Sequence, residues 1–62
     1  MFKFRDYTLK QVDNSDWWRV FLNGSIMATL INKEEARRFI WLQYKDKEDI
    51  DYISETDLEK VA

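Results

Sequence analysis

The feature that most constrains this chain is the pair Asn23-Gly24, which lies between two strand-like runs, residues 17–22 and 25–31. A two-residue hairpin turn of type I′ needs a positive φ at both central positions, which Asn and Gly tolerate. Apolar and branched residues dominate both flanking runs, as they do in paired strands. The sequence therefore predicts an antiparallel hairpin centred on this pair.

Two registers are open for this hairpin, and they differ in which face Arg19 occupies. A strict two-residue loop pairs Phe21 with Ile26 and carries Arg19 into the apolar face, where an unpaired charge costs on the order of several kcal/mol. A three-residue loop with a bulge at Gly24 pairs Val20 with Ile26 and turns Arg19 outward. We expect the second register because it leaves no charge on the buried face.

The expected register separates the adjacent tryptophans Trp17 and Trp18. Since successive side chains of a strand point to opposite faces, the core face collects Trp18, Val20, Ile26, Ala28 and Leu30. The opposite face then carries Trp17, Arg19, Phe21 and Met27. Either another element covers these four residues, or they form a binding surface.

Residues 2–12 are predicted to form a strand that precedes this hairpin. Their apolar side chains change phase, because Phe2 and Phe4 share one parity whereas Tyr7 and Leu9 share the other. We expect a bulge near residues 5–6 to reconcile the two parities. The polar residues 13–16 then predict a turn into the hairpin.

A helix is predicted to follow the hairpin. Asn32 is a suitable N-cap, and Glu35 stands three residues later, as in a capping box. At 100° per residue, one stripe of the helix should face the sheet. This stripe comprises Ala36, Phe39, Ile40 and Gln43, and Leu42 and Tyr44 lie at its flanks. Trp41 projects on the opposite side, where it is grouped with Arg37, Arg38 and Lys45.

The charge balance changes after residue 45. Residues 1–45 contain eight Lys/Arg and five Asp/Glu, a net of +3, whereas residues 46–62 contain two and seven, a net of −5. We expect the acidic segment to end in a short helix capped by Ser54 or Thr56, and to dock through its apolar residues on the basic helix face. If it docks there, it covers Trp41.

These patterns together predict an α+β fold in one small domain spanning residues 1–62. A three-stranded antiparallel sheet (β-β-β-α) would carry one helix on one face, followed by a short acidic helix or strand. Residues 1–45 would form the sheet-and-helix body, and residues 46–62 an acidic closing segment.

Composition removes most enzymatic chemistry. The chain has no Cys and no His, so it lacks the readiest nucleophile, the usual proton carrier near neutral pH and the ligands of a conventional zinc site. The acidic run 46–51 lacks the glycine and the terminal glutamate of a calcium loop. We expect no catalysis, no cofactor and no metal. Without a signal-like or membrane-spanning apolar run, we also expect a cytoplasmic location.

Binding is the function class that remains. Trp, Tyr and Arg dominate protein interfaces, and two groups of such residues are candidates for partner contact: Trp17, Arg19, Phe21 and Met27 on the sheet, and Arg37, Arg38, Trp41 and Lys45 on the helix. We expect a small protein-binding module, as a regulator or inhibitor of a larger protein or as a homodimer. Such a small, cofactor-free chain would suit a phage or another mobile element.

Two alternatives from other classes stay open. One is a nucleic-acid binder that uses the sheet or the basic helix face, and the other is an acidic mimic of nucleic acid. Three strands followed by a helix beginning "KEEARRFI" resemble, in element order, the small DNA-binding domains of integrases and plant AP2 factors. That resemblance implies a sheet that enters the major groove, but the outward face offers Arg19 where such a sheet usually presents several basic residues.

Overall fold

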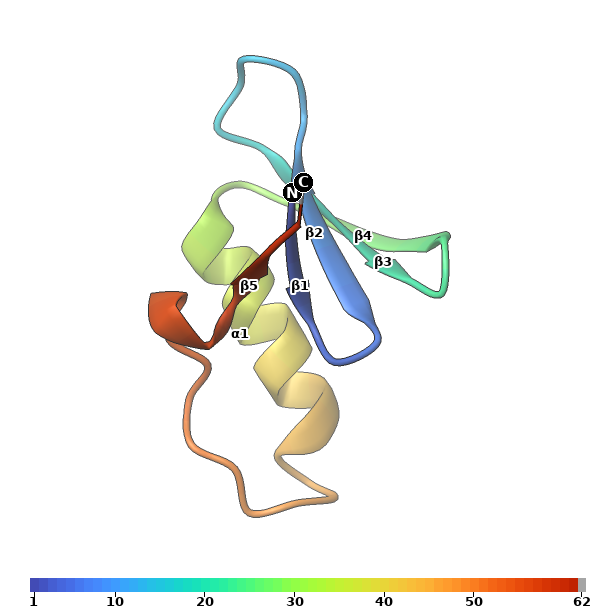
Figure 1. The fold of residues 1–62 in the computed structure, drawn as a ribbon. Coiled ribbons are helices and arrows are strands. Elements are labelled where there is room, and N and C mark those ends of the chain that lie inside the picture. The colour runs from blue at the N-terminus through green and yellow to red at the C-terminus, as the bar shows by residue number, and fades with distance from the viewer. Residues whose placement is uncertain (62) are drawn as a thin grey trace.

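A computed structural model describes residues 1–61, in which one helix packs across one face of an antiparallel sheet (Figure 1). The elements, in chain order, are β1 (Phe2–Phe4), β2 (Tyr7–Gln11), β3 (Trp18–Leu22), β4 (Ser25–Leu30), α1 (Lys33–Tyr44), the 3₁₀ turn η1 (Glu55–Asp57) and β5 (Glu59–Lys60). The strand order across the sheet is β4-β3-β2-β1-β5. The predicted α+β class is confirmed, but the sheet has five strands and not three.

The first additional strand arises within residues 2–11, which were expected to form one bulged strand. They form a tight hairpin instead, in which Phe4 pairs with Tyr7 and Phe2 pairs with Leu9. Arg5 adopts a φ of 53° in the turn. The change of parity in the sequence therefore marks a reversal of the chain, which brings all four apolar side chains to one face.

The hairpin at Asn23-Gly24 is confirmed, with φ values of 51° and 86° at the two turn residues. Its predicted register is wrong, because Phe21 pairs with Ile26 across a strict two-residue turn. A β-bulge then leaves Met27 as an extra residue, so that Val20 pairs with Ala28.

Because of the bulge, most of the residues predicted for the core face still point toward the core. Val20 is fully buried and Arg19 is exposed, as expected, while Trp18 is half-buried against the core. Ile26 is the exception, since it lies on the turn side of the bulge and is 59% exposed. The turn fixes the pairing at its end of the hairpin, and the extra residue at the bulge reverses which side chains of β4 face the core farther along the strand.

The predicted turn at residues 13–16 and the predicted helix start are both present. The side chain of Asn32 accepts a hydrogen bond from the backbone N–H of Glu35 at 2.8 Å. Ala36 and Ile40 of α1 are buried. Gln43 was expected in the same stripe but is exposed, and its amide donates to the carbonyl oxygen of Phe39.

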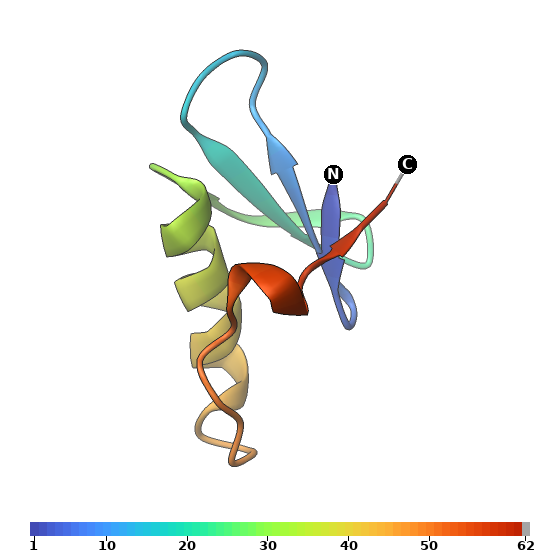
Figure 2. The same ribbon diagram turned by 60° about the vertical axis from the view of Figure 1, so that its left-hand side comes forward.

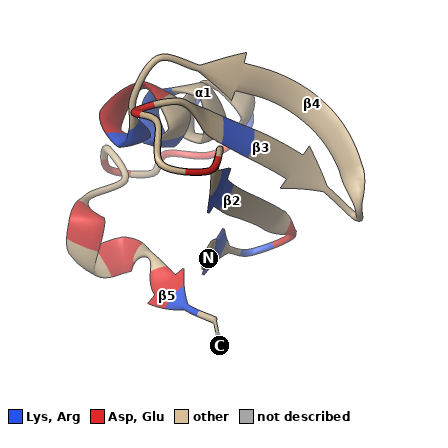
Figure 3. Ribbon diagram, turned by 90° about the horizontal axis from the view of Figure 1, so that it is seen from above, with Lys and Arg blue, Asp and Glu red and all other residues tan. Residues whose placement is uncertain are grey.

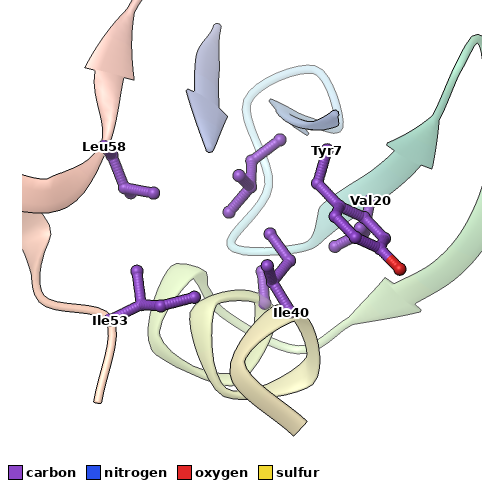
Figure 4. Close-up of a cluster of buried hydrophobic side chains, with 7 residues drawn as sticks. Tyr7, Val20, Ile40, Ile53 and Leu58 are labelled. Atoms are coloured by element: carbon purple, nitrogen blue, oxygen red, sulfur yellow. The ribbon is translucent and has the colours of Figure 1, made fainter. Parts of the chain in front are cut away.

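The segment after α1 returns along the helix and joins the sheet, as the orange and red chain in Figure 2 shows. Its expected closing helix is the single 3₁₀ turn η1, preceded by Ser54 at the N-cap, and β5 then pairs with β1. Ile53 and Leu58 of this segment are buried and point into the core from the side opposite Tyr7 and Val20 (Figure 4). The core is thus built from the sheet, the helix and the closing segment: Tyr7, Leu9, Val20, Ala36, Ile40, Ile53 and Leu58.

Candidate protein-binding face

One face of the sheet is covered by α1 and the closing segment, and the other face is open. Alternation along the strands and their register place two rows of side chains on the open face. Lys3, Thr8, Phe21 and Ile26 form one row, and Lys10, Arg19 and Thr29 form the other. Continued alternation adds Trp17, which immediately precedes β3. We call this set, together with Met27 at the bulge, the outer sheet face.

Large apolar side chains are exposed along the margin of the outer sheet face. Trp17 and Met27 are each 48% exposed, and Ile26 is 59% exposed. Ile31 follows directly after β4 and is 60% exposed. Ile26 and Met27 lie at the turn end of the β3–β4 hairpin together with half-buried Phe21, whereas Trp17 and Ile31 lie beyond its other end, so the basic row separates two exposed apolar groups. Exposed apolar groups of this kind are typical of interaction sites.

The centre of the outer sheet face is basic. Lys10 and Arg19 are directly opposite each other on β2 and β3, and Lys3 lies on β1. All three are exposed, and within residues 1–61 none forms a salt bridge. Figure 3 shows blue segments on β2 and β3, while β5 at the other end of the sheet carries a red segment, where Glu59 pairs with Lys3.

A depression of about 170 Å³ lies at one end of this basic row. Its lining consists of Lys10, Gln11, Val12, Asp13 and Arg19. Pockets for small-molecule ligands usually occupy about 300–1,000 Å³. The depression is therefore suited to one side chain of a partner and not to a whole substrate.

The second predicted group, on α1, is arranged differently. Arg37 is half-buried, where its Nη1 donates to the carbonyl oxygen of Ile53 at 3.1 Å and its Nε lies 3.6 Å from the Glu55 carboxylate. Trp41 is also half-buried, with its ring 5.2 Å from that of Tyr52. The closing segment thus covers both residues, as docking on the basic helix face predicts.

Arg38 and Lys45, the other two helix candidates, remain exposed. The Lys45 ammonium lies 5.5 Å from the centroid of the Trp41 ring. With Arg37 and Trp41 held by the closing segment, these four residues do not form a continuous open surface. The structure brings together the sheet candidates and separates them from the helix candidates, which belong to the opposite layer.

The closing segment is held by a cluster that the sequence analysis did not identify. Lys33 forms an ion pair with Glu55, and its ammonium lies 3.5 Å from the Phe2 ring centroid and 5.3 Å from that of Trp18. A cation close to aromatic faces is stabilised by their quadrupoles. Lys33 and Arg37 therefore neutralise part of the acidic segment and fix it to the body.

A second cluster fixes the β1–β2 turn against the end of α1. The guanidinium of Arg5 lies 4.7 Å from the Tyr44 ring centroid and is hydrogen-bonded to Glu48 at 2.7 Å. That hydrogen bond raises the pKa of Arg5. Burial, followed by the neighbouring Tyr7, raises the pKa of Tyr44. Both shifts have structural causes, and neither group belongs to the outer sheet face.

Among the charged and large apolar residues of the open face and its margin, sequence reasoning missed Lys3, Lys10, Ile26 and Ile31. Ile26 was assigned to the core because the bulge was placed at Gly24. Lys3 and Lys10 were hidden by the phase change in residues 2–11, which obscured the face of each position. Recognition of a reversal at residues 5–6 would have placed both lysines on the same face as Arg19.

No group of His, Cys, Asp or Glu side chains within residues 1–61 is arranged to hold a metal ion. In that same part of the chain, no helix has the length and apolar character needed to cross a membrane. Comparisons with known protein families, with curated proteins and with solved structures find no match to this chain.

Proposed function

We propose that this protein is a non-enzymatic binding module that regulates or inhibits a larger protein through its outer sheet face. One observation carries this proposal: helix and closing segment cover the same side of the sheet, and the side left open carries Trp17 and Met27 half-exposed beside Arg19. Folding alone does not require exposed tryptophan and methionine.

The composition and size of this face support a protein partner. Interface centres are enriched in Trp, Phe, Met and Arg, and the outer sheet face contains each of them. A standard interface buries about 800 Å² on each partner. That area is less than a fifth of the 4474 Å² surface of this chain, so one sheet face provides enough area.

Nucleic-acid binding is the second candidate, and the uncovered side chains of Lys3, Lys10 and Arg19 favour it. The acidic-mimic alternative loses support, because the carboxylate of Glu48 is paired with Arg5 and that of Glu55 with Lys33 and Arg37. Fewer free carboxylates are then left to imitate a phosphate backbone.

The test compares two aromatic residues of similar exposure on opposite layers, Trp17 at 48% and Tyr52 at 42%. The immobilised protein and its Trp17→Ala and Tyr52→Ala variants are used to capture proteins from cells of its source, with circular dichroism as a check of folding. We expect Trp17→Ala to lose the captured protein and Tyr52→Ala to retain it. Retention of the captured protein by Trp17→Ala would contradict the proposal.

A further inference from the structure

We infer that the partner of the outer sheet face presents an acidic segment, and that Lys10 and Arg19 receive its carboxylates. This inference rests on the proposed function and names the chemistry of the partner. In such a segment apolar side chains next to the carboxylates would contact Trp17 and Met27, while one carboxylate enters the depression between β2 and β3.

The first support is that folding does not explain the pair Lys10 and Arg19. The two residues are directly opposite each other in the β2–β3 register, where like charges destabilise a sheet. The chain contains twelve Asp/Glu, yet within residues 1–61 no acidic side chain is paired with either cation. A locally unfavourable, uncompensated charge pair is expected where function requires it.

The second support is the shape of the surface beside this pair. Lys10 and Arg19 both line the depression together with Val12 and the single acidic residue Asp13, so its lining has a net positive charge. The backbone N–H of Val12 donates to the carbonyl oxygen of Trp17 at 2.9 Å, so the exposed tryptophan immediately adjoins the depression. A guanidinium binds a carboxylate through two parallel hydrogen bonds. The site therefore combines a seat for one carboxylate with an apolar surface next to it.

A second copy of the chain fits this face poorly. Face-to-face packing about a twofold axis presents the same surface on both copies, so the basic rows of the two sheets would repel each other. Pairing through the edge strand β4 is hindered by the bulge between Ile26 and Ala28, because a bulge at an edge twists it away from regular pairing.

Nucleic acid also fits less well than an acidic protein segment. Proteins that bind DNA through its backbone typically contact about 6–10 phosphates, whereas the outer sheet face offers Lys3, Lys10 and Arg19. In the neighbouring row, the residues nearest the β3–β4 turn are Phe21 and Ile26. An extended polyanion would leave these two apolar side chains unused and would continue past a chain with a net charge of −2.

The test uses fluorescent peptides in which Asp alternates with Leu and Trp, and a matched peptide with Asn in place of Asp. A third peptide carries Lys in place of Asp, and a thymidine oligonucleotide serves as the nucleic-acid probe. We expect the Asp peptide to bind at least about tenfold more tightly than the Asn peptide. Tighter binding of the oligonucleotide, equal binding of the Asp and Asn peptides, or no binding by any probe would overturn the inference.

Charge reversal assigns the effect to named residues. Arg19→Glu should weaken the binding of the Asp peptide about tenfold or more and strengthen the binding of the Lys peptide. Lys47→Glu makes the same charge change outside the outer sheet face and should leave the affinity for both peptides unchanged. Arg19→Glu also creates an opposite-charge pair with Lys10, so its urea unfolding midpoint should rise. A lower midpoint would show that Arg19 serves the fold and would contradict our interpretation.

Capture experiments separate failure of the inference from failure of the proposed function. A captured protein that is lost with Trp17→Ala but retained with Arg19→Glu would leave the proposed function standing and refute the acidic partner. Loss with both variants supports both statements, and retention with both refutes both.

Discussion

Removal of the Ile53 side chain tests whether the closing segment is part of the core. Ile53 is 1% exposed, whereas Ile31 is 60% exposed, so the pair allows the same substitution at opposite extremes of burial. Truncation of a buried isoleucine to alanine costs about 2–5 kcal/mol. A chain of this length has about 3–9 kcal/mol of stability in total. Ile53→Ala should therefore remove at least about a fifth of the free energy of unfolding, while Ile31→Ala should change it by about 0.5 kcal/mol or less.

Urea denaturation followed by circular dichroism and tryptophan fluorescence measures both variants. Because the ring of Trp41 lies against Tyr52 in the closing segment, partial release of that segment by Ile53→Ala should also shift tryptophan emission to the red in the absence of urea. Equal losses of stability for the two variants, or a loss below about 0.5 kcal/mol for Ile53→Ala, would refute the docking of this segment in the core.

Two further predictions concern the sheet and the closing turn. Trp18→Ala should cost about 3 kcal/mol, since Trp18 packs against the core, and Trp17→Ala about 1 kcal/mol or less in the isolated protein; denaturation of both variants measures the difference, and the reverse order would show that the two faces are exchanged. A hydrogen bond from the backbone N–H of Ser54 lowers the pKa of Asp57 below its ordinary value of 3.8. The folded state therefore favours the ionised carboxylate, and its contribution to stability is present above pH 3.8 and is lost as the pH falls through the lowered pKa. Asp57→Asn should flatten this acidic limb of the stability profile, and an unchanged limb would contradict the assignment.

The elements predicted correctly from the sequence are those set by local chemistry. Asn23 and Gly24 tolerate the positive φ of the turn, and Asn32 caps α1 with its own side chain. The element missed was set by pairing: residues 2–11 contain no Asn-Gly or other strong turn signal, and Arg5 occupies the left-handed position of their turn. A positive φ at arginine is tolerated only because Phe2 and Phe4 then pair with Leu9 and Tyr7 over the core.

The candidate site was predictable to a similar degree. The outward positions of Trp17, Arg19 and Phe21 followed from alternation and from the cost of burying a charge, and these positions hold in the structure. The exposure of Ile26 did not follow, because a bulge at Met27 leaves no signature in the sequence. The positions of Lys3 and Lys10 on the same face as Arg19 depend on pairing between strands that are separated in sequence, which no local pattern specifies.

The two sides of the sheet differ in how their charges are paired. On the covered side Lys33 and Arg37 are paired with Glu55 and Arg5 with Glu48, whereas Arg38 and Lys45 of α1 form no salt bridge within residues 1–61. On the open side Lys10 and Arg19 lie opposite each other, neither forms a salt bridge within residues 1–61, and Asp13 lines the depression beside them. Exposed ion pairs contribute only about 0–1 kcal/mol each, so the closing segment is held mainly by the burial of Ile53 and Leu58. Its ion pairs keep Glu48 and Glu55 on the covered side, and Glu59 pairs with Lys3 at the β5 edge. The row of Lys10 and Arg19 is thereby left open to an acidic partner.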